Sequence, residues 1–298
     1  MPPYIIQKPL ITTLRLLARL THPIPPPDPT TTETISIPSR DPSRTIKAHL
    51  YNPPTTNPRT PTPILLNLSG TGFTIPSHGI DAPFATYLTT HTPYSLLDLS
   101  YRLAPEHPFP FPAALQDAHD ALAYILSQPN RFDTSRIALC GFSAGGGGLA
   151  ASLAANPDLL PQGMKVHALV AFYPVVDATV PAGEKMPEVD LGRRMLGGSI
   201  PAGVMRFSQG CYLRGDGGGV GRCLFVVCQG DSLAGETERL VGRLRGGDGD
   251  GDGDGERVVR AVKVMGVGHA WDKIARAGSW EAQERDRAYA AVVELLNE

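Results

Sequence analysis

The sequence feature that most constrains the fold is a serine between two glycines, in Gly141-Phe142-Ser143-Ala144-Gly145. The apolar run 136–140 before it has the length of a buried strand, and the small residues 145–155 after it favour a helix. A direct strand-to-helix turn strains the central residue, so the positions beside it must be small. The strain lifts the serine hydroxyl clear of the sheet. We therefore take Ser143 as the candidate nucleophile.

Strand and helix patterns alternate from residue 64 onward. Short apolar runs predict strands at 64–68, 95–99, 137–140, 168–173, 223–229 and 258–265. Helices are expected at 80–91, 113–127, 145–155, 233–245 and 280–296. This alternation predicts an α/β fold, with a mostly parallel sheet covered by helices on both faces. Residues 34–37 and 46–51 are expected to add antiparallel edge strands, and the 298 residues are expected to form a single domain.

Charge and cysteine content limit the classes of binding partner and the compartment that we expect for this chain. The chain has 27 Lys and Arg against 29 Asp and Glu, and the net charge of -2 gives no electrostatic basis for binding nucleic acid. Its four cysteines have no paired spacing, which favours reduced thiols and a cytoplasmic protein. We expect a small-molecule substrate and no cofactor or metal, and the sequence leaves a homodimer as one alternative.

The N-terminal segment 4–20 is apolar, but Pro9 and three basic residues interrupt it, so we expect no membrane span. It is either an amphipathic helix packed on the domain or a mitochondrial presequence. The Asp-Gly repeats within 246–255 predict a flexible, solvated insertion. A calcium loop is the alternative there, although Val259 stands where such a loop carries glutamate.

A serine nucleophile needs a base within hydrogen-bond reach. Only His167 and His269 follow Ser143 in the chain, and the base follows the nucleophile in sheets with this turn. His167 precedes the expected strand at 168–173 and therefore lies at the wrong end of the sheet. His269 follows the last expected strand among glycines that let a loop curl over the turn. We predict His269 as the base.

The base in turn needs an acid that orients it. Asp231 comes directly after the expected strand 223–229, at the edge where the base and nucleophile also lie. Asp216 lies in a glycine-rich loop before that strand, and Asp272 is expected at the surface or as a helix cap. Asp231 is therefore the predicted acid, with a simple helix cap as the alternative. Negative charge on the substrate oxygen needs backbone donors, which we expect from Ala144 and from the small residues of loop 69–73.

Four ordered motifs together resemble the hormone-sensitive-lipase-like family of α/β-hydrolases, also called type IV esterases, and its fungal members most. The motifs are Tyr101 to Pro110, Gly141 to Gly146, Asp231-Ser232-Leu233 and His269-Ala270-Trp271. The resemblance implies an α/β-hydrolase fold with an eight-stranded sheet and a helical lid. It also implies that Thr71 and Gly72 join Ala144 in an oxyanion hole, and that Arg102 and Glu106 form an ion pair supporting this loop.

The chain departs from the family pattern at three places. Ser69 and Thr71 replace the first and third residues of an oxyanion loop that usually begins with histidine followed by glycines. The stretch 109–112 carries two residues more than the usual motif. The stretch between Tyr212 and Cys223 is short and rich in glycine, so part of the usual lid connection is missing.

The residues and the resemblance together predict a serine hydrolase that cleaves carboxylic esters of small to medium, apolar substrates through an acyl-enzyme. Residues 1–32 and 177–213 are expected to form the lid over the acyl pocket. One alternative keeps the pocket for cyclisation, elimination or acyl transfer in a biosynthetic pathway of secondary metabolism. The other is a binding protein without catalysis, which the resemblance implies for members that have lost the histidine.

Overall fold

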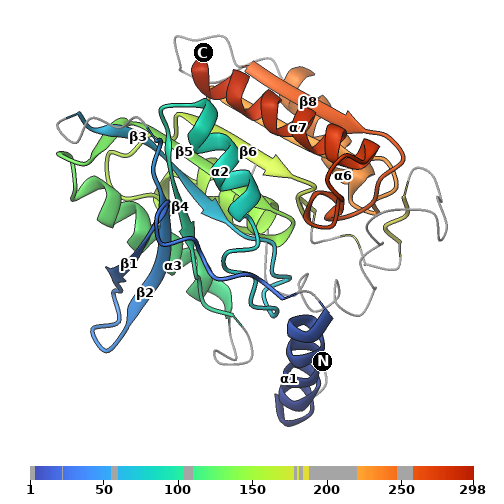
Figure 1. Cartoon of the computed structure of the whole chain (residues 1–298), viewed down its shortest axis with the longest axis horizontal. Coiled ribbons are helices and arrows are strands. Elements are labelled where there is room, and N and C mark those ends of the chain that lie inside the picture. The colour runs from blue at the N-terminus through green and yellow to red at the C-terminus, as the bar shows by residue number, and fades with distance from the viewer. Residues whose placement is uncertain are drawn as a thin grey trace.

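The computed structural model describes residues 4–21, 23–54, 60–103, 110–177, 180, 184–187, 220–246 and 258–298. Eight strands form one sheet in the order β1-β2-β4-β3-β5-β6-β7-β8 (Figure 1). Their bounds are β1 Thr32–Pro38, β2 Thr45–Tyr51, β3 Thr62–Leu68, β4 Ser95–Leu99, β5 Phe132–Phe142, β6 Ala168–Phe172, β7 Arg222–Cys228 and β8 Val258–Val264. Strand β2 pairs antiparallel with β1 and β4, and the remaining pairs are parallel. The predicted α/β-hydrolase sheet with antiparallel strands at one edge is confirmed.

The helices follow the expected segments with small shifts of their ends. They are α1 Tyr4–Thr21, α2 Ala82–His91, α3 Pro110–Leu126, α4 Ser152–Ala155, α6 Ala234–Gly246 and α7 Trp280–Asn297. The expected helix at 145–155 begins as a π-helix, η1 Gly145–Ala151, before α4. Two short 3-10 turns, η2 Pro157–Leu159 and η4 Trp271–Lys273, are additions that the sequence patterns did not predict.

The central strands are buried on both faces and send alternate side chains to two separate cores. In β3, Leu66 joins the core under α3, η1 and α6, whereas Leu65 joins the core under α2 and α7. Helices α2 and α7 lie side by side over their face of the sheet (Figure 1). Burial of both faces explains why these strands read as continuous apolar runs rather than as alternating patterns.

The carboxyl ends of the parallel strands meet at one edge of the sheet. Ser69 follows β3, Ser143 follows β5, and Asp231 and His269 lie a few residues beyond β7 and β8. Loops at this edge are where binding and chemistry concentrate in α/β sheets. The fold therefore brings the predicted site residues to one place.

The N-terminal helix α1 lies at the end of the molecule away from the last turn of α7 (Figure 1). Arg15 donates from Nε to the carbonyl of Thr74 at 2.7 Å, so α1 is tied to the segment that follows loop 69–73. Of the helices in the described ranges, none has both the length and the hydrophobicity to cross a bilayer. Most of the predicted lid segment 177–213 and residues 247–255 of the predicted insertion lie outside the described residues.

Candidate active site

Ser143 occupies a strained turn between β5 and η1. Its φ of 51° is in the left-handed region, which non-glycine residues rarely adopt. Three backbone hydrogen bonds hold it there. The Ser143 amide donates to the Phe172 carbonyl at 2.9 Å, and the Ser143 carbonyl accepts from the amides of Gly147 at 3.0 Å and Val175 at 3.3 Å. The surrounding structure thus fixes the strain, as expected where strain serves a function.

Glycine is required on both sides of this turn because the backbones touch. A Cβ on Gly145 would lie 1.9 Å from the Leu68 carbonyl oxygen, and one on Gly141 would lie 2.3 Å from the Gly145 carbonyl oxygen. Neither distance leaves room for a side chain. The two glycines therefore let the end of β3 pack directly against the turn that carries Ser143.

The structure brings Ser143, His269 and Asp231 into one hydrogen-bonded chain. His269 Nε2 lies 2.9 Å from Ser143 Oγ, and His269 Nδ1 lies 2.7 Å from Asp231 Oδ2. Asp231 is fully buried, and its Oδ1 accepts from the Leu233 amide at 3.1 Å. The Gly230 amide donates to the Val267 carbonyl at 2.9 Å, so the loops carrying acid and base hold each other. This is the geometry that lets an imidazole accept a serine proton while a carboxylate fixes its orientation.

The residues that the sequence analysis rejected as base or acid are not part of this hydrogen-bonded chain. His167 donates its amide to the Ile137 carbonyl at the amino end of β6, far along the sheet from the chain of three residues. Asp216 lies outside the described residues. The expectation for Asp272 was wrong: its carboxylate is buried and accepts from the hydroxyls of Tyr173 at 2.7 Å and Tyr289 at 3.1 Å. Aromatic side chains distant in sequence cover it, which its local context did not indicate.

Loop 69–73 lies against the nucleophile. A Cβ on Gly70 would come within 3.3 Å of the Ser143 Cβ, so the loop backbone passes directly beside the serine. Gly72 and Phe73 both have positive φ, 52° and 58°, and turn the chain sharply there. Thr71 and Gly72, predicted to supply amides, are therefore in the loop segment next to Ser143, and Ala144 follows it directly.

The two unusual side chains of this loop are anchored. The Tyr101 hydroxyl donates to the Ser69 carbonyl at 2.7 Å, so the Thr71 hydroxyl, 2.7 Å away, donates to Tyr101. Thr71 Oγ1 in turn accepts from the Phe73 amide at 2.9 Å. Ser69 Oγ donates to Asp98 Oδ1 at 3.1 Å. Ser69 and Thr71 thus take part in the loop's own hydrogen bonds, and Tyr101, inside a motif the sequence singled out, is the anchor that sequence reasoning missed.

The profile of the alpha/beta hydrolase fold matches residues 65–271, more than half of the chain. The chain belongs to this family. The hormone-sensitive-lipase-like resemblance is confirmed with it, whereas the likeness to fungal members stays a prediction. Ser143, Asp231 and His269 follow one another in the order that nucleophile, acid and base take in this fold.

Curated relatives of this chain include two esterases. The chain is 31% identical to the ethyl acetate hydrolase of Pseudomonas putida over 157 residues, 51% of this chain and 47% of the relative. It is 32% identical to the esterase LipI of Mycobacterium tuberculosis over 107 residues, 35% of this chain and 33% of the relative. The matches thus span half or less of these relatives' length. Among solved structures, the thermophilic carboxylesterase EstE1 from a metagenomic library superposes with a TM-score of 0.72 at 24% identity, over 97% of each chain.

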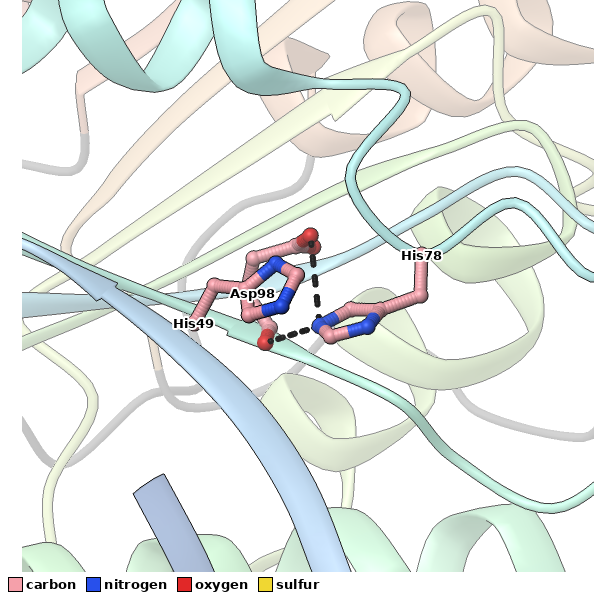
Figure 2. A group of neighbouring side chains, drawn as sticks. All are labelled: His49, His78 and Asp98. Carbon is pink, nitrogen blue, oxygen red and sulfur yellow. Dashed lines mark hydrogen bonds and ion pairs between the residues drawn. The ribbon is translucent and has the colours of Figure 1, made fainter. Parts of the chain in front are cut away.

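Behind loop 69–73 lies a cluster of His49, His78 and Asp98, in which His49 and Asp98 are buried and His78 is partly buried (Figure 2). The Asp98 carboxylate accepts from Asn67, Ser69 and the Gly79 amide. Burial, with repulsion from Asp81, raises the pKa of Asp98 to about 7. Burial lowers the pKa of both His78 and His49 to about 4, so both imidazoles are neutral at pH 7.

The same cluster is the group of described residues that comes nearest to a metal site, with ligand atoms within 4.8 Å of one another. The cluster does not suit a metal, because a ring nitrogen that donates a hydrogen bond has no lone pair for an ion. His78 Nε2 donates to the Asp98 carbonyl at 3.1 Å, and the two imidazoles stack with ring centroids 3.9 Å apart (Figure 2). Stacked rings direct their in-plane lone pairs alongside each other rather than toward one ion. We interpret the cluster as support for loop 69–73.

Arg102 pairs with a residue that the sequence analysis did not single out. Arg102 donates from its amide at 2.8 Å and from Nε at 2.9 Å to Asp117 in α3, which also pairs with Arg44. Glu106 lies outside the described residues. Arg102, next to Tyr101, is thus held by the fully buried Asp117 of α3.

A groove of about 860 Å³ opens beside the base. It runs between the chain after α1, the start of α2 and the turn after His269. Its lining includes Pro23, Ile24, Ile80, Pro83, His269 and Ile274. These walls are mainly apolar, as is common for sites that bind small molecules.

Proposed function

We propose that this protein is a carboxylic ester hydrolase that works through an acyl-enzyme on Ser143. The observation that carries the proposal is the chain of hydrogen bonds from Ser143 Oγ through His269 to Asp231 at the carboxyl edge of the sheet. Relatives that are themselves an ethyl acetate hydrolase and an esterase support ester substrates. They favour hydrolysis over cyclisation, elimination or acyl transfer, and a filled histidine position speaks against a protein that only binds.

The residues perform two half-reactions in this proposal. Ser143 Oγ attacks the ester carbonyl carbon while His269 Nε2 takes its proton, and Asp231 holds the imidazole and offsets its positive charge. The amides of Thr71, Gly72 and Ala144 stabilise the negative oxygen. His269 then returns the proton to the departing alcohol oxygen. Water adds to the acyl group by the same route in reverse and releases the acid.

The proposed substrates are small to medium apolar esters. The apolar groove that reaches His269 supports them, since the histidine must meet the alcohol oxygen that leaves. We also propose residues 1–32 and 177–213 as the lid, and the hydrogen bond from Arg15 in α1 to the Thr74 carbonyl supports this for α1. The mainly apolar lining beside His269 suits acyl and alcohol groups without formal charge.

The proposal is tested by intact-protein mass spectrometry after brief exposure to a panel of short p-nitrophenyl esters. The expected result is release of nitrophenol and a transient mass increase equal to the acyl group, mapped to Ser143. Protein first blocked with a fluorophosphonate is the control and takes up no acyl group. Hydrolysis without any adduct on Ser143, or rapid adduct formation in the blocked protein, contradicts the mechanism.

A cytoplasmic location is part of the proposal. Three buried cysteines, Cys140, Cys223 and Cys228, are free thiols, which suits a reducing compartment. Fluorescence microscopy of the tagged chain tests this location and separates it from the mitochondrial alternative. Analytical ultracentrifugation decides between monomer and the homodimer alternative.

A further inference from the structure

Lys273 is a buried cation directly behind the proposed triad. It ends η4, four residues after His269, and its side chain is 10% exposed. The ammonium lies 2.7 Å from Asp81 Oδ1 and 2.7 Å from Asp272 Oδ2, both on fully buried side chains. Burial alone would lower the pKa of Lys273, but Asp272 and Asp81 together raise it, so the ammonium stays charged.

The same ammonium contacts the strand that carries the nucleophile. Its nitrogen lies 3.4 Å from the ring centroid of Phe142, the residue immediately before Ser143. A cation over an aromatic face is held electrostatically, most strongly where water is excluded. Lys273 therefore joins the turn that follows His269 to the last residue of β5.

Each of the two carboxylates that bind Lys273 also contacts a residue in another part of the site. Asp272 accepts from the hydroxyl of Tyr173, whose ring meets the His269 imidazole edge-on with centroids 4.8 Å apart. Asp81, at the start of α2, accepts from Asn67 Nδ2 at 2.9 Å. The ammonium is thus the shared partner of one group beside the base and one group beside the oxyanion loop.

Asn67 completes the connection to the oxyanion loop. Its Nδ2 also donates to Asp98 Oδ1 at 3.0 Å, and the same oxygen accepts from Ser69 Oγ. A line of buried polar contacts therefore runs from Tyr173 to Ser69 through Lys273. Buried ion pairs contribute little stability compared with apolar packing, so stability alone gives a weak reason for charges here. Proton transfer between Ser143 and His269, in contrast, is lost rapidly when the two are displaced by about 1 Å.

We propose that Lys273 is a positioning residue that holds the His269 loop, the Ser143 turn and the oxyanion loop in register. The proposal rests on the proposed ester hydrolysis. Lys273 borders the groove beside His269, but its ammonium is engaged by Asp81, Asp272 and the Phe142 ring, so its removal is expected to change the rate of the chemical steps much more than substrate binding.

The test compares Lys273→Met with Arg136→Met, which removes a cation held over the Tyr94 ring in the first half of β5, away from the carboxyl edge of the sheet. We expect Lys273→Met to lower kcat about 100-fold with KM within about threefold, because the reacting groups lose alignment. Arg136→Met should keep kcat within twofold even where it lowers the melting temperature as much. A kcat within threefold of wild type for Lys273→Met, or an equal loss of kcat in Arg136→Met, overturns the proposal.

A second variant covers the case in which Lys273→Met does not fold. Asp81→Asn keeps the shape of the side chain but weakens its ion pair with Lys273, and we expect kcat to fall about tenfold at unchanged KM. An unchanged kcat would contradict the positioning role of Lys273.

The rate at which a fluorophosphonate labels Ser143 is measured in parallel. If the wild type labels rapidly but hydrolyses no ester, the proposed function fails while the labelling rates still decide the role of Lys273. If the wild type neither labels nor hydrolyses, both proposals fail.

Discussion

The two faces of the sheet are packed with different kinds of side chain. The core under α3, η1 and α6 is mainly aliphatic, with Leu122, Leu139 and Leu149 fully buried in it. The core under α2 and α7 is rich in aromatic rings, among which Phe142 stacks on Phe172 at 4.4 Å. Only this second core, among the described residues, encloses the ion pairs of Lys273. The difference indicates that the aromatic face aligns His269 with Ser143, whereas the aliphatic face supplies stability and, through Tyr101, anchors loop 69–73.

The sharpest separation of activity from stability is expected at Ser143. Ser143→Ala removes the attacking oxygen, so kcat/KM for p-nitrophenyl esters should fall by about four to six orders of magnitude. The melting temperature should stay close to that of the wild type or rise, because the hydroxyl makes one bond and the strained φ is unchanged. Ser135→Ala, at the exposed start of β5, is the control. Near-normal turnover by Ser143→Ala would exclude the serine mechanism.

A substitution in the aliphatic core, in contrast, should lower stability and leave kcat nearly unchanged. Leu122→Ala in α3 opens a cavity in a closely packed core and is expected to cost about 2–5 kcal/mol of unfolding free energy. The kcat of the protein that remains folded should change by less than threefold. Urea unfolding and activity at a low temperature measure the two effects. A tenfold loss of kcat here would remove the contrast between the faces.

An intermediate effect is expected at the anchor of the oxyanion loop. Tyr101→Phe deprives the Ser69 carbonyl and the Thr71 hydroxyl of their shared partner, so the loop loosens and kcat should fall about tenfold. Tyr94→Phe is a matched control, since Tyr94 is buried just before β4 while Tyr101 lies just after it. Steady-state kinetics on one ester compares them. Equal kcat values for the two variants would show that the loop does not depend on Tyr101.

The smallest expected effect is a change in the pH dependence of stability when His49 is replaced. Both ring nitrogens of His49 are buried without a hydrogen-bond partner among the described residues, and its folded pKa of about 4 lies below the ordinary 6.5. Unfolding therefore takes up a proton between these values, so this histidine lowers stability as the pH falls below about 6.5. His49→Phe should reduce the stability lost between pH 7.5 and pH 5 by about 1–2 kcal/mol. Urea unfolding at both pH values measures it, and an equal loss in both proteins would contradict the assignment.

The site could be predicted in outline because its parts are marked locally. Ser143 sits at a strand-to-helix change, and Asp231 and His269 each follow an apolar run that reads as a strand. Chain order then identified which histidine shares an edge with the serine. Asp272 was assigned wrongly because its partners are distant along the chain. Tyr173, directly after β6, is 99 residues away, and Tyr289 in α7 is 17 residues away.

By itself the sequence determined the eight strands, their alternation with helices, and the three residues that meet at the carboxyl edge. These features follow from side-chain periodicity and from glycine at strained turns, which act over a few residues. Only the tertiary structure decided that Tyr101 anchors the oxyanion loop, that Arg102 pairs with Asp117, and that Lys273 lies between Asp81 and Asp272. Such pairings depend on which segments the sheet brings together and on the exclusion of water from between them, and no local pattern along the chain records either.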